Sequence, residues 1–332
     1  MQLRLQFQEN RVADEVSAVT AVVRPILEGL LYGLKGEVVQ AAGGHENVPL
    51  MMLPRLYRPG DRDCGICFEY AVHDAVSRRE PAVLERINDA IRVCNVLGDH
   101  PSSILFGLEK TGALNLIDTV KERLTEESRL LAGTRGQPAK LKRHIDSIAA
   151  AFRKREAREV LPWSISGLWR ADLFIGYTDA DRWLATTVKI NPTQLQGDRG
   201  LRIGIVPATQ GRTDRIQQDE ARNLVICPLP YDGGFMEVFY QGWGVVQQFI
   251  AADANVPREA MLPRPPDRQV ARYLTERREF AVVDVLEALR PLAQPELLRT
   301  QEQNANLISR RETEFAVETG AVLAPMARVL GT

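Results

Sequence analysis

The chain has 332 residues, of which 45% are hydrophobic, and its 42 basic and 43 acidic residues give a formal net charge of −1. This length favours two domains, and the composition is that of a globular protein. A charge so close to zero argues against a protein that coats nucleic acid, but it allows a local nucleic-acid site.

Three absences predict where the protein works. The sequence contains no apolar run of about 18 residues, which a membrane-spanning helix would need. Its first residues lack the pattern of a secretory signal. Four cysteines are too few for a disulfide framework in a chain of this length, so the expected location is a reducing cytoplasm.

Helical spacing of apolar residues dominates the first half of the chain. It recurs from about residue 12 to residue 42, so the segment 1–60 is expected to be helical. A second helix is expected from Gly65 to about Ser77. Residues 80–158 are expected to be helical almost throughout, with a helix start at Pro101-Ser102-Ser103.

A β-hairpin is expected in the middle of the chain. Residues 171–177 and 183–191 are rich in β-branched and aromatic side chains, and the intervening 178–182 is polar. Side chains alternate along a strand, so Thr187 and Lys189 share one face.

The hairpin brings an acid close to a lysine. Folding the chain about Ala180 places Asp172 opposite Val188 or Lys189, whichever register the turn selects. Residues in such positions have Cβ atoms about 4.5–5.5 Å apart. An acid and a lysine at that distance in an apolar strand are typical of a catalytic or metal-binding site. The alternative is a buried salt bridge in an ordinary sheet.

Asp172, the hairpin turn and Thr187-Val188-Lys189 resemble the PD-(D/E)XK nuclease superfamily, which has the restriction-endonuclease-like fold. The family pattern is an Asp on one strand, then an acidic residue, any residue and Lys on the next strand. A Glu on a preceding helix often joins them, and Glu69 holds that position here. The sequence departs from the pattern at Thr187, where the family has Asp or Glu.

This resemblance implies an α/β (α+β) fold with a central mixed sheet flanked by helices, and large helical N-terminal, inserted and C-terminal segments. The nuclease-like core would comprise 61–79 and 159–255, with 80–158 as a helical insertion and 264–332 as a C-terminal helical segment. The two runs Leu201–Val206 and Asn223–Cys227 read as further core strands. A helix at Gly242–Ile250 would pack on the sheet, and Pro263–Pro266 would be a linker.

The resemblance also implies a role for each site residue. Mg²⁺ or Mn²⁺ would be bound by the carboxylates of Asp172 and Glu69 and by the main-chain carbonyl of Val188. Lys189 would position the attacking water or stabilise developing charge. Mg²⁺ takes one or two protein carboxylates and keeps water on its other positions, so two acids suffice. Thr187 offers only a hydroxyl, which is a poorer ligand.

The function implied is a metal-dependent endonuclease of the restriction or anti-phage kind, acting on DNA rather than RNA, with no membrane partner. A partner protein of a defence system and a homodimer are both left open. The alternative is a non-catalytic protein that keeps the fold to bind DNA or a partner, its metal site having lapsed at Thr187.

Two groups of basic residues are candidate phosphate contacts. Arg153, Lys154 and Arg155 close the expected helical insertion, and Arg212 and Arg215 lie in a polar loop between two expected strands. Basic side chains beside a nuclease core could follow a phosphate backbone. The alternative is a solvated face of mixed charge, because acidic residues are interleaved with the first group.

Two remaining features carry less weight. Cys64 and Cys67 have the spacing of a redox or metal motif, but the sequence around them favours packing at a helix start. His73 lies one helical turn after Glu69, so it could face the same site.

Overall fold

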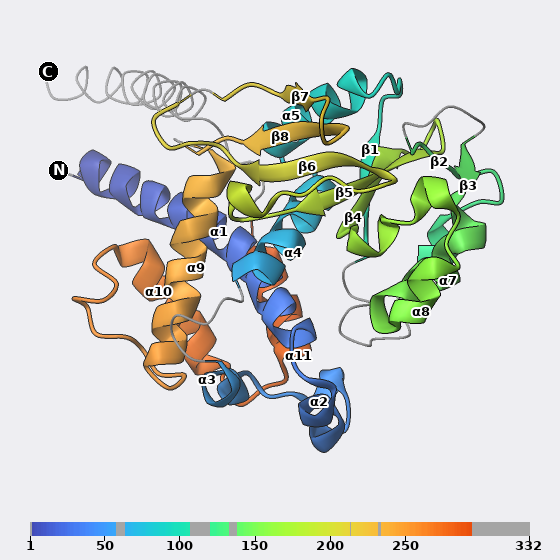
Figure 1. Ribbon diagram of the computed structural model, residues 1–332. Coiled ribbons are helices and arrows are strands. Elements are labelled where there is room, and N and C mark those ends of the chain that lie inside the picture. Colours follow the sequence, from blue (N-terminus) through green and yellow to red (C-terminus); the bar gives the residue numbers. More distant parts are fainter. Residues whose placement is uncertain are drawn as a thin grey trace, which may run out of the picture.

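The computed structural model describes residues 2–57, 64–106, 120–132, 138–212, 214–231 and 234–293, with side chains described from Glu15 onward except at Arg153. The fold is a mixed α/β arrangement in which helices flank one sheet, as the sequence predicts (Figure 1).

The sheet combines antiparallel and parallel pairs. Strand β5 lies at its centre, antiparallel to β4 and parallel to β6, and β6 is parallel to β8. The outer pairs are antiparallel, β1 with β4 and β7 with β8. In spatial order these strands are β1 (Pro101–Leu105), β4 (Leu173–Tyr177), β5 (Arg182–Val188), β6 (Leu201–Pro207), β8 (Leu224–Leu229) and β7 (Gln217–Asp219). Two short strands, β2 (Arg129–Leu130) and β3 (Ala139–Lys140), pair with each other, and β2 also pairs with the start of β5.

Each face of the sheet has its own hydrophobic core, because successive side chains of a strand point to opposite faces. In β4, Leu173 and Ile175 join one core and Phe174 joins the other. Both faces are covered, which explains why every residue of the two hairpin strands except Arg182 is buried.

The larger core lies between the sheet and a group of long helices. Helix α1 (Gln2–Tyr32) packs against several others, which is why its apolar residues are buried on more than one side. The helices around it are α4 (Cys64–Ser77), α9 (Phe235–Ala251), α10 (Pro265–Glu276) and α11 (Val282–Leu289). Helix α5 (Pro81–Val93) packs on β8.

The smaller core lies on the opposite face, under α7 (Leu141–Arg153) and α8 (Arg155–Glu159) (Figure 1). The remaining helices are short: α2 (Gly36–Ala42), α3 (Leu53–Leu56) and the 3-10 turns His45–Asn47, Leu50–Met52, Trp163–Ile165, Leu168–Arg170, Pro192–Gln194 and Arg290–Leu292. Among the described residues no single helix could cross a membrane. The segments Glu15–Tyr32 and Gly36–Ala42 reach sufficient length only as a pair, and that pair is bent by 96°.

One prediction for the segment 80–158 is wrong. It is not helical almost throughout, because Pro101–Leu105 forms strand β1 and pairs with β4 along its whole length. The Pro-Ser-Ser sequence was expected to begin a helix, but the apolar Ile104 and Leu105 complete a strand that the edge of β4 holds in place. Pairing with a distant strand outweighs a local helix signal here.

Several other boundaries move. Helix α9 begins at Phe235, before the expected Gly242, and the N-terminal helix ends at Tyr32 with α2 as a separate helix. The expected linker at 263–266 is shorter, because Pro265 is already the first residue of α10, where proline is favoured. The C-terminal segment 264–332 is described to residue 293, and this part contains α10 and α11, in agreement with the helical segment that the sequence predicts. Its residues after 293 lie outside the described part.

Candidate active site

The register of the hairpin differs by one residue from the expectation. Leu173 lies opposite Thr186, and the Asp172 N–H donates to the Thr186 carbonyl at 2.9 Å. In the register of the two strands, Asp172 therefore lies opposite Thr187 and not opposite Val188 or Lys189. The cause is the turn, which comprises four residues, 178–181, because β5 already begins at Arg182. A shorter turn changes which residues face each other across a hairpin.

The Asp172 carboxylate is fully buried and one of its oxygens accepts three hydrogen bonds. Oδ2 lies 3.0 Å from Thr187 Oγ1, 2.9 Å from the Val188 nitrogen and 2.8 Å from Lys189 Nζ. Burying an unpaired charge costs several kcal/mol, so a buried carboxylate needs partners of this kind. The bonds from Thr187 and Val188 hold the end of β5 against the start of β4, and the bond from Lys189 fixes the position of its ammonium.

Helix α4 brings the third predicted residue to this point. Lys189 Nζ lies 3.7 Å from Glu69 Oε1, and the Glu69 side chain is only 13% exposed. The ammonium therefore lies between two carboxylates that are far apart in the sequence. The Lys189 side chain is 29% exposed, so solvent can reach the lysine that links the two acids.

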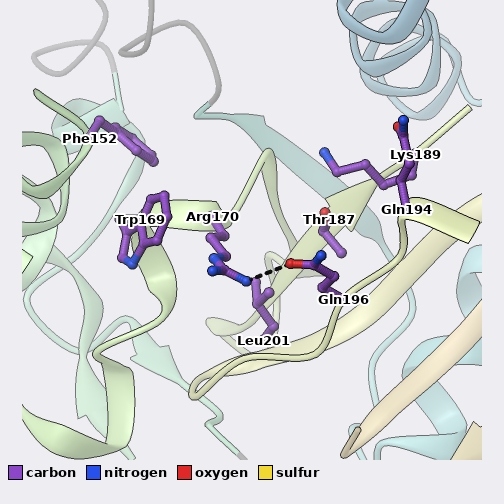
Figure 2. Close-up of a pocket in the computed structure, with 8 residues that line it drawn as sticks. All are labelled: Phe152, Trp169, Arg170, Thr187, Lys189, Gln194, Gln196 and Leu201. Carbon is purple, nitrogen blue, oxygen red and sulfur yellow. Dashed lines mark hydrogen bonds between the residues drawn. The ribbon is translucent and has the colours of Figure 1, made fainter.

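A pocket of about 250 Å³ opens beside Lys189 on the face of the sheet under α7 and α8. Figure 2 shows Lys189 and Thr187 at one end, Phe152 and Trp169 at the other, and Arg170 between them. The other lining residues are Gln194, Gln196 and Leu201.

Arg170 organises the wall of this pocket. Its Nη1 donates to Gln196 Oε1 at 2.9 Å (Figure 2), and its Nε lies 3.2 Å from Asp198 Oδ2. Its guanidinium also lies 4.8 Å from the centre of the Trp169 ring, which a second guanidinium, that of Arg158, approaches to 3.7 Å. Cation–π contacts of this kind orient both partners.

The sequence analysis missed the wall residues Trp169, Arg170 and Gln196. One signal was available, since the Leu-Trp-Arg run ends two residues before Asp172 and so must lie near it. Nothing in the sequence indicates that Gln196, which follows β5 in a loop, returns to the same place.

His73 does not join the lysine and its two acids. Its Nδ1 lies 2.7 Å from Ser103 Oγ on strand β1. Burial, and secondarily the charge of Arg123, lower the pKa of His73 to about 4, so the imidazole is neutral at pH 7. The ring is thus part of the contact between α4 and β1.

The candidate phosphate contacts lie on the surface. Lys154 and Arg155 are exposed where α7 meets α8, while the side chain of Arg153 lies outside the described residues. Arg212 and Arg215 are exposed in the loop between β6 and β7. These side chains are therefore accessible to a ligand.

The two helix-start cysteines are packed into the protein. Cys67 is buried and its thiol lies 3.5 Å from the Ile26 carbonyl of α1. Burial raises the pKa of the Cys64 thiol to about 12, so it is protonated and a weak nucleophile at neutral pH.

The acidic pair matches the kind of ligands that Mg²⁺ and Mn²⁺ take. Mg²⁺ binds one or two protein carboxylates and keeps several waters, and here two carboxylates surround one ammonium. In the described part of the chain, no three His, Cys, Asp or Glu side chains come together to hold a metal ion. The donor chemistry of Asp172 and Glu69 is that of a magnesium ligand pair, and the cation that lies between them in this structure is the Lys189 ammonium.

Comparison with known proteins adds no constraint: no family model, no curated protein and no solved structure matches this chain.

Proposed function

We propose that the chain is a metal-dependent nuclease that hydrolyses phosphodiester bonds in DNA. One observation carries the proposal: the ammonium of the partly exposed Lys189 side chain lies between the buried carboxylate of Asp172 and that of Glu69, at 2.8 and 3.7 Å. The resemblance of Asp172 and Lys189 to the PD-(D/E)XK pattern supports the same reading.

Each residue has a chemical task in this proposal. Asp172, Glu69 and the Val188 carbonyl would hold Mg²⁺ or Mn²⁺, which when bound supplies charge neutralisation and an activated water. Lys189 donates to a phosphate oxygen and stabilises the charge that builds on it. Thr187 donates to Asp172 and keeps that carboxylate directed at Lys189.

The setting follows from the resemblance. We propose a cytoplasmic enzyme of a restriction or anti-phage system, acting with a partner protein or as a homodimer. DNA is preferred to RNA as its substrate. The exposed basic residues Lys154, Arg155, Arg212 and Arg215 would contact phosphates away from the cut.

The test is cleavage of plasmid DNA in Mg²⁺, in Mn²⁺ and in EDTA by the wild type and by Lys189→Met. Methionine keeps the length of the side chain and removes its charge. Lys142→Met is the matched control, because Lys142 is also partly exposed and pairs with a glutamate, Glu126, at 3.2 Å. Loss of one donor that acts on the transition state lowers the rate by about 10²–10³-fold.

We expect cleavage with either metal by the wild type and the control, and none in EDTA. Cleavage by Lys189→Met at the wild-type rate, or cleavage in EDTA, would contradict the proposal. Lys189 is a better target than Asp172, because Asp172 also holds the main chain of Val188 and its loss disturbs the fold.

A second candidate is a non-catalytic protein that binds DNA. It is favoured by Thr187, which stands where the nuclease pattern has an acid and already donates to Asp172. In that case the wild type binds DNA equally well in EDTA and in Mn²⁺ and cuts it in neither.

A further inference from the structure

The pocket beside Lys189 is lined by two aromatic rings, two glutamines, a threonine, a leucine and the side chains of Arg170 and Lys189. We propose that it accepts one unstacked base of a single DNA strand, so that the preferred substrate is single-stranded or locally unpaired. This inference rests on the proposed function. It assumes that the DNA strand whose phosphodiester bond is cut beside Lys189 is the strand that places a base in the neighbouring pocket.

Arg170, the charged side chain in the middle of the pocket wall, is already paired with Asp198 at 3.2 Å. Lys189 lies at the end of the pocket, where the phosphate of the bound strand would meet it (Figure 2). The rest of the lining is apolar or neutral and polar, from Phe152, Trp169 and Leu201 together with the two glutamines and Thr187. A phosphate would favour unpaired cations, whereas a base favours ring faces and amides.

The amide of Gln196 has a fixed orientation. Arginine has only donors, so the atom of Gln196 that meets Arg170 Nη1 must be its oxygen. The Nε2 of Gln196 is therefore directed away from Arg170, and it is a donor. All four bases carry ring nitrogens or carbonyl oxygens that can accept from it, so the pocket is tolerant of sequence.

The size of the pocket excludes a base pair that stays in its helix. Its volume of about 250 Å³ lies below the range of about 300–1,000 Å³ for drug-sized ligands, so it suits one ring system with part of its sugar. A base inside a duplex would first have to leave its stack, at a cost of a few kcal/mol. A single strand avoids most of this cost.

The experiment measures binding, not cleavage. Fluorescein-labelled thymidylate 12-mers, single-stranded or paired with the adenylate 12-mer, are titrated with the full chain in EDTA and followed by anisotropy. Phe152→Leu removes the ring face but keeps apolar bulk against Phe106, whose ring centre is 5.0 Å away. Gln196→Glu still accepts from Arg170 but replaces the donor by an anionic oxygen. Gln218→Glu, exposed on β7, adds the same charge away from the pocket.

We expect the single strand to bind more tightly than the duplex. Phe152→Leu should weaken single-strand binding by about fivefold or more, since stacking one base is worth about 1–3 kcal/mol. Gln196→Glu should also weaken it, because the donor to the base is replaced by an anionic oxygen that repels the acceptors of the base. Gln218→Glu should leave it within about twofold, and the duplex affinity should be the same for all variants. Tighter binding of the duplex, or single-strand binding that neither pocket variant weakens, would overturn the inference.

The two proposals fail separately. If the wild type cleaves DNA with metal but neither pocket variant changes single-strand binding, the nuclease proposal stands and the base-pocket proposal is wrong. Single-strand binding that depends on Phe152 and Gln196, without cleavage in any metal, keeps the pocket and removes the nuclease.

Discussion

Replacing Asp172 by Asn tests how far the fold depends on the carboxylate that joins β4 to β5. The change keeps the shape and one accepting oxygen but removes the charge opposite Lys189. Removing one partner of a buried ion pair costs about 3–5 kcal/mol. The cost should be lower here, because the Lys189 side chain is 29% exposed and has Glu69 as a second partner at 3.7 Å. We expect a loss of about 2–3 kcal/mol, which a protein with a typical stability of about 5–15 kcal/mol survives.

The matched control is Asp146→Asn. Asp146 pairs with Lys121 at 2.7 Å, nearly the same distance as Asp172 and Lys189, but its side chain is 66% exposed. Exposed pairs contribute about 0–1 kcal/mol. The comparison thus varies burial and holds the chemistry of the pair nearly constant.

Urea unfolding at pH 7 in EDTA, followed by circular dichroism, measures both losses. The midpoint should fall clearly for Asp172→Asn and little for Asp146→Asn, with a shared slope. Equal losses for the two variants would refute the reasoning, because burial would then have no effect on the value of the pair. A change in slope would indicate an altered unfolded or native state.

Three further changes test other parts of the molecule. Burial raises the pKa of Glu28 to about 7, so the folded state binds the carboxyl proton more tightly than the unfolded state, and the free energy of unfolding should fall as the pH rises from about 4.5 to 7. Urea titrations at pH 5 and pH 8 should show that Glu28→Gln removes much of this fall. An unchanged pH dependence in the variant would mean that Glu28 is not its cause. Thr187→Glu places a carboxylate beside that of Asp172, so it should lower the melting temperature in EDTA, and Mn²⁺ should raise the melting temperature of the variant more than that of the wild type. Equal, tight Mn²⁺ binding by both proteins would mean that the wild type already has its full set of acids. A Cβ on Gly176 would clash with the main-chain carbonyl oxygen of Arg182 across the hairpin, so Gly176→Ala should cost about 1–3 kcal/mol in urea unfolding. A Cβ on Gly244 meets no atom within 4 Å, so Gly244→Ala should be tolerated.

The sequence by itself determined the local elements that carry the site. Alternation and β-branched residues predicted the strands on both sides of the turn, and helical spacing predicted the helix of Glu69. These signals are readable because each depends on neighbours only a few residues away. The resemblance to the PD-(D/E)XK pattern, and not a local signal, joined Glu69 to Asp172 and Lys189.

Only the tertiary structure decided how those elements meet. The turn length placed Asp172 opposite Thr187 and not opposite Val188 or Lys189. The edge of β4 made a strand of Pro101–Leu105, where the local signal indicated a helix. The pocket depends on Arg170, at the end of a 3-10 turn before β4, and on Gln196, in the segment after β5, which meet through one hydrogen bond. Contacts of this kind have no period and no fixed spacing in the chain, because they arise from the packing of segments that are distant in sequence.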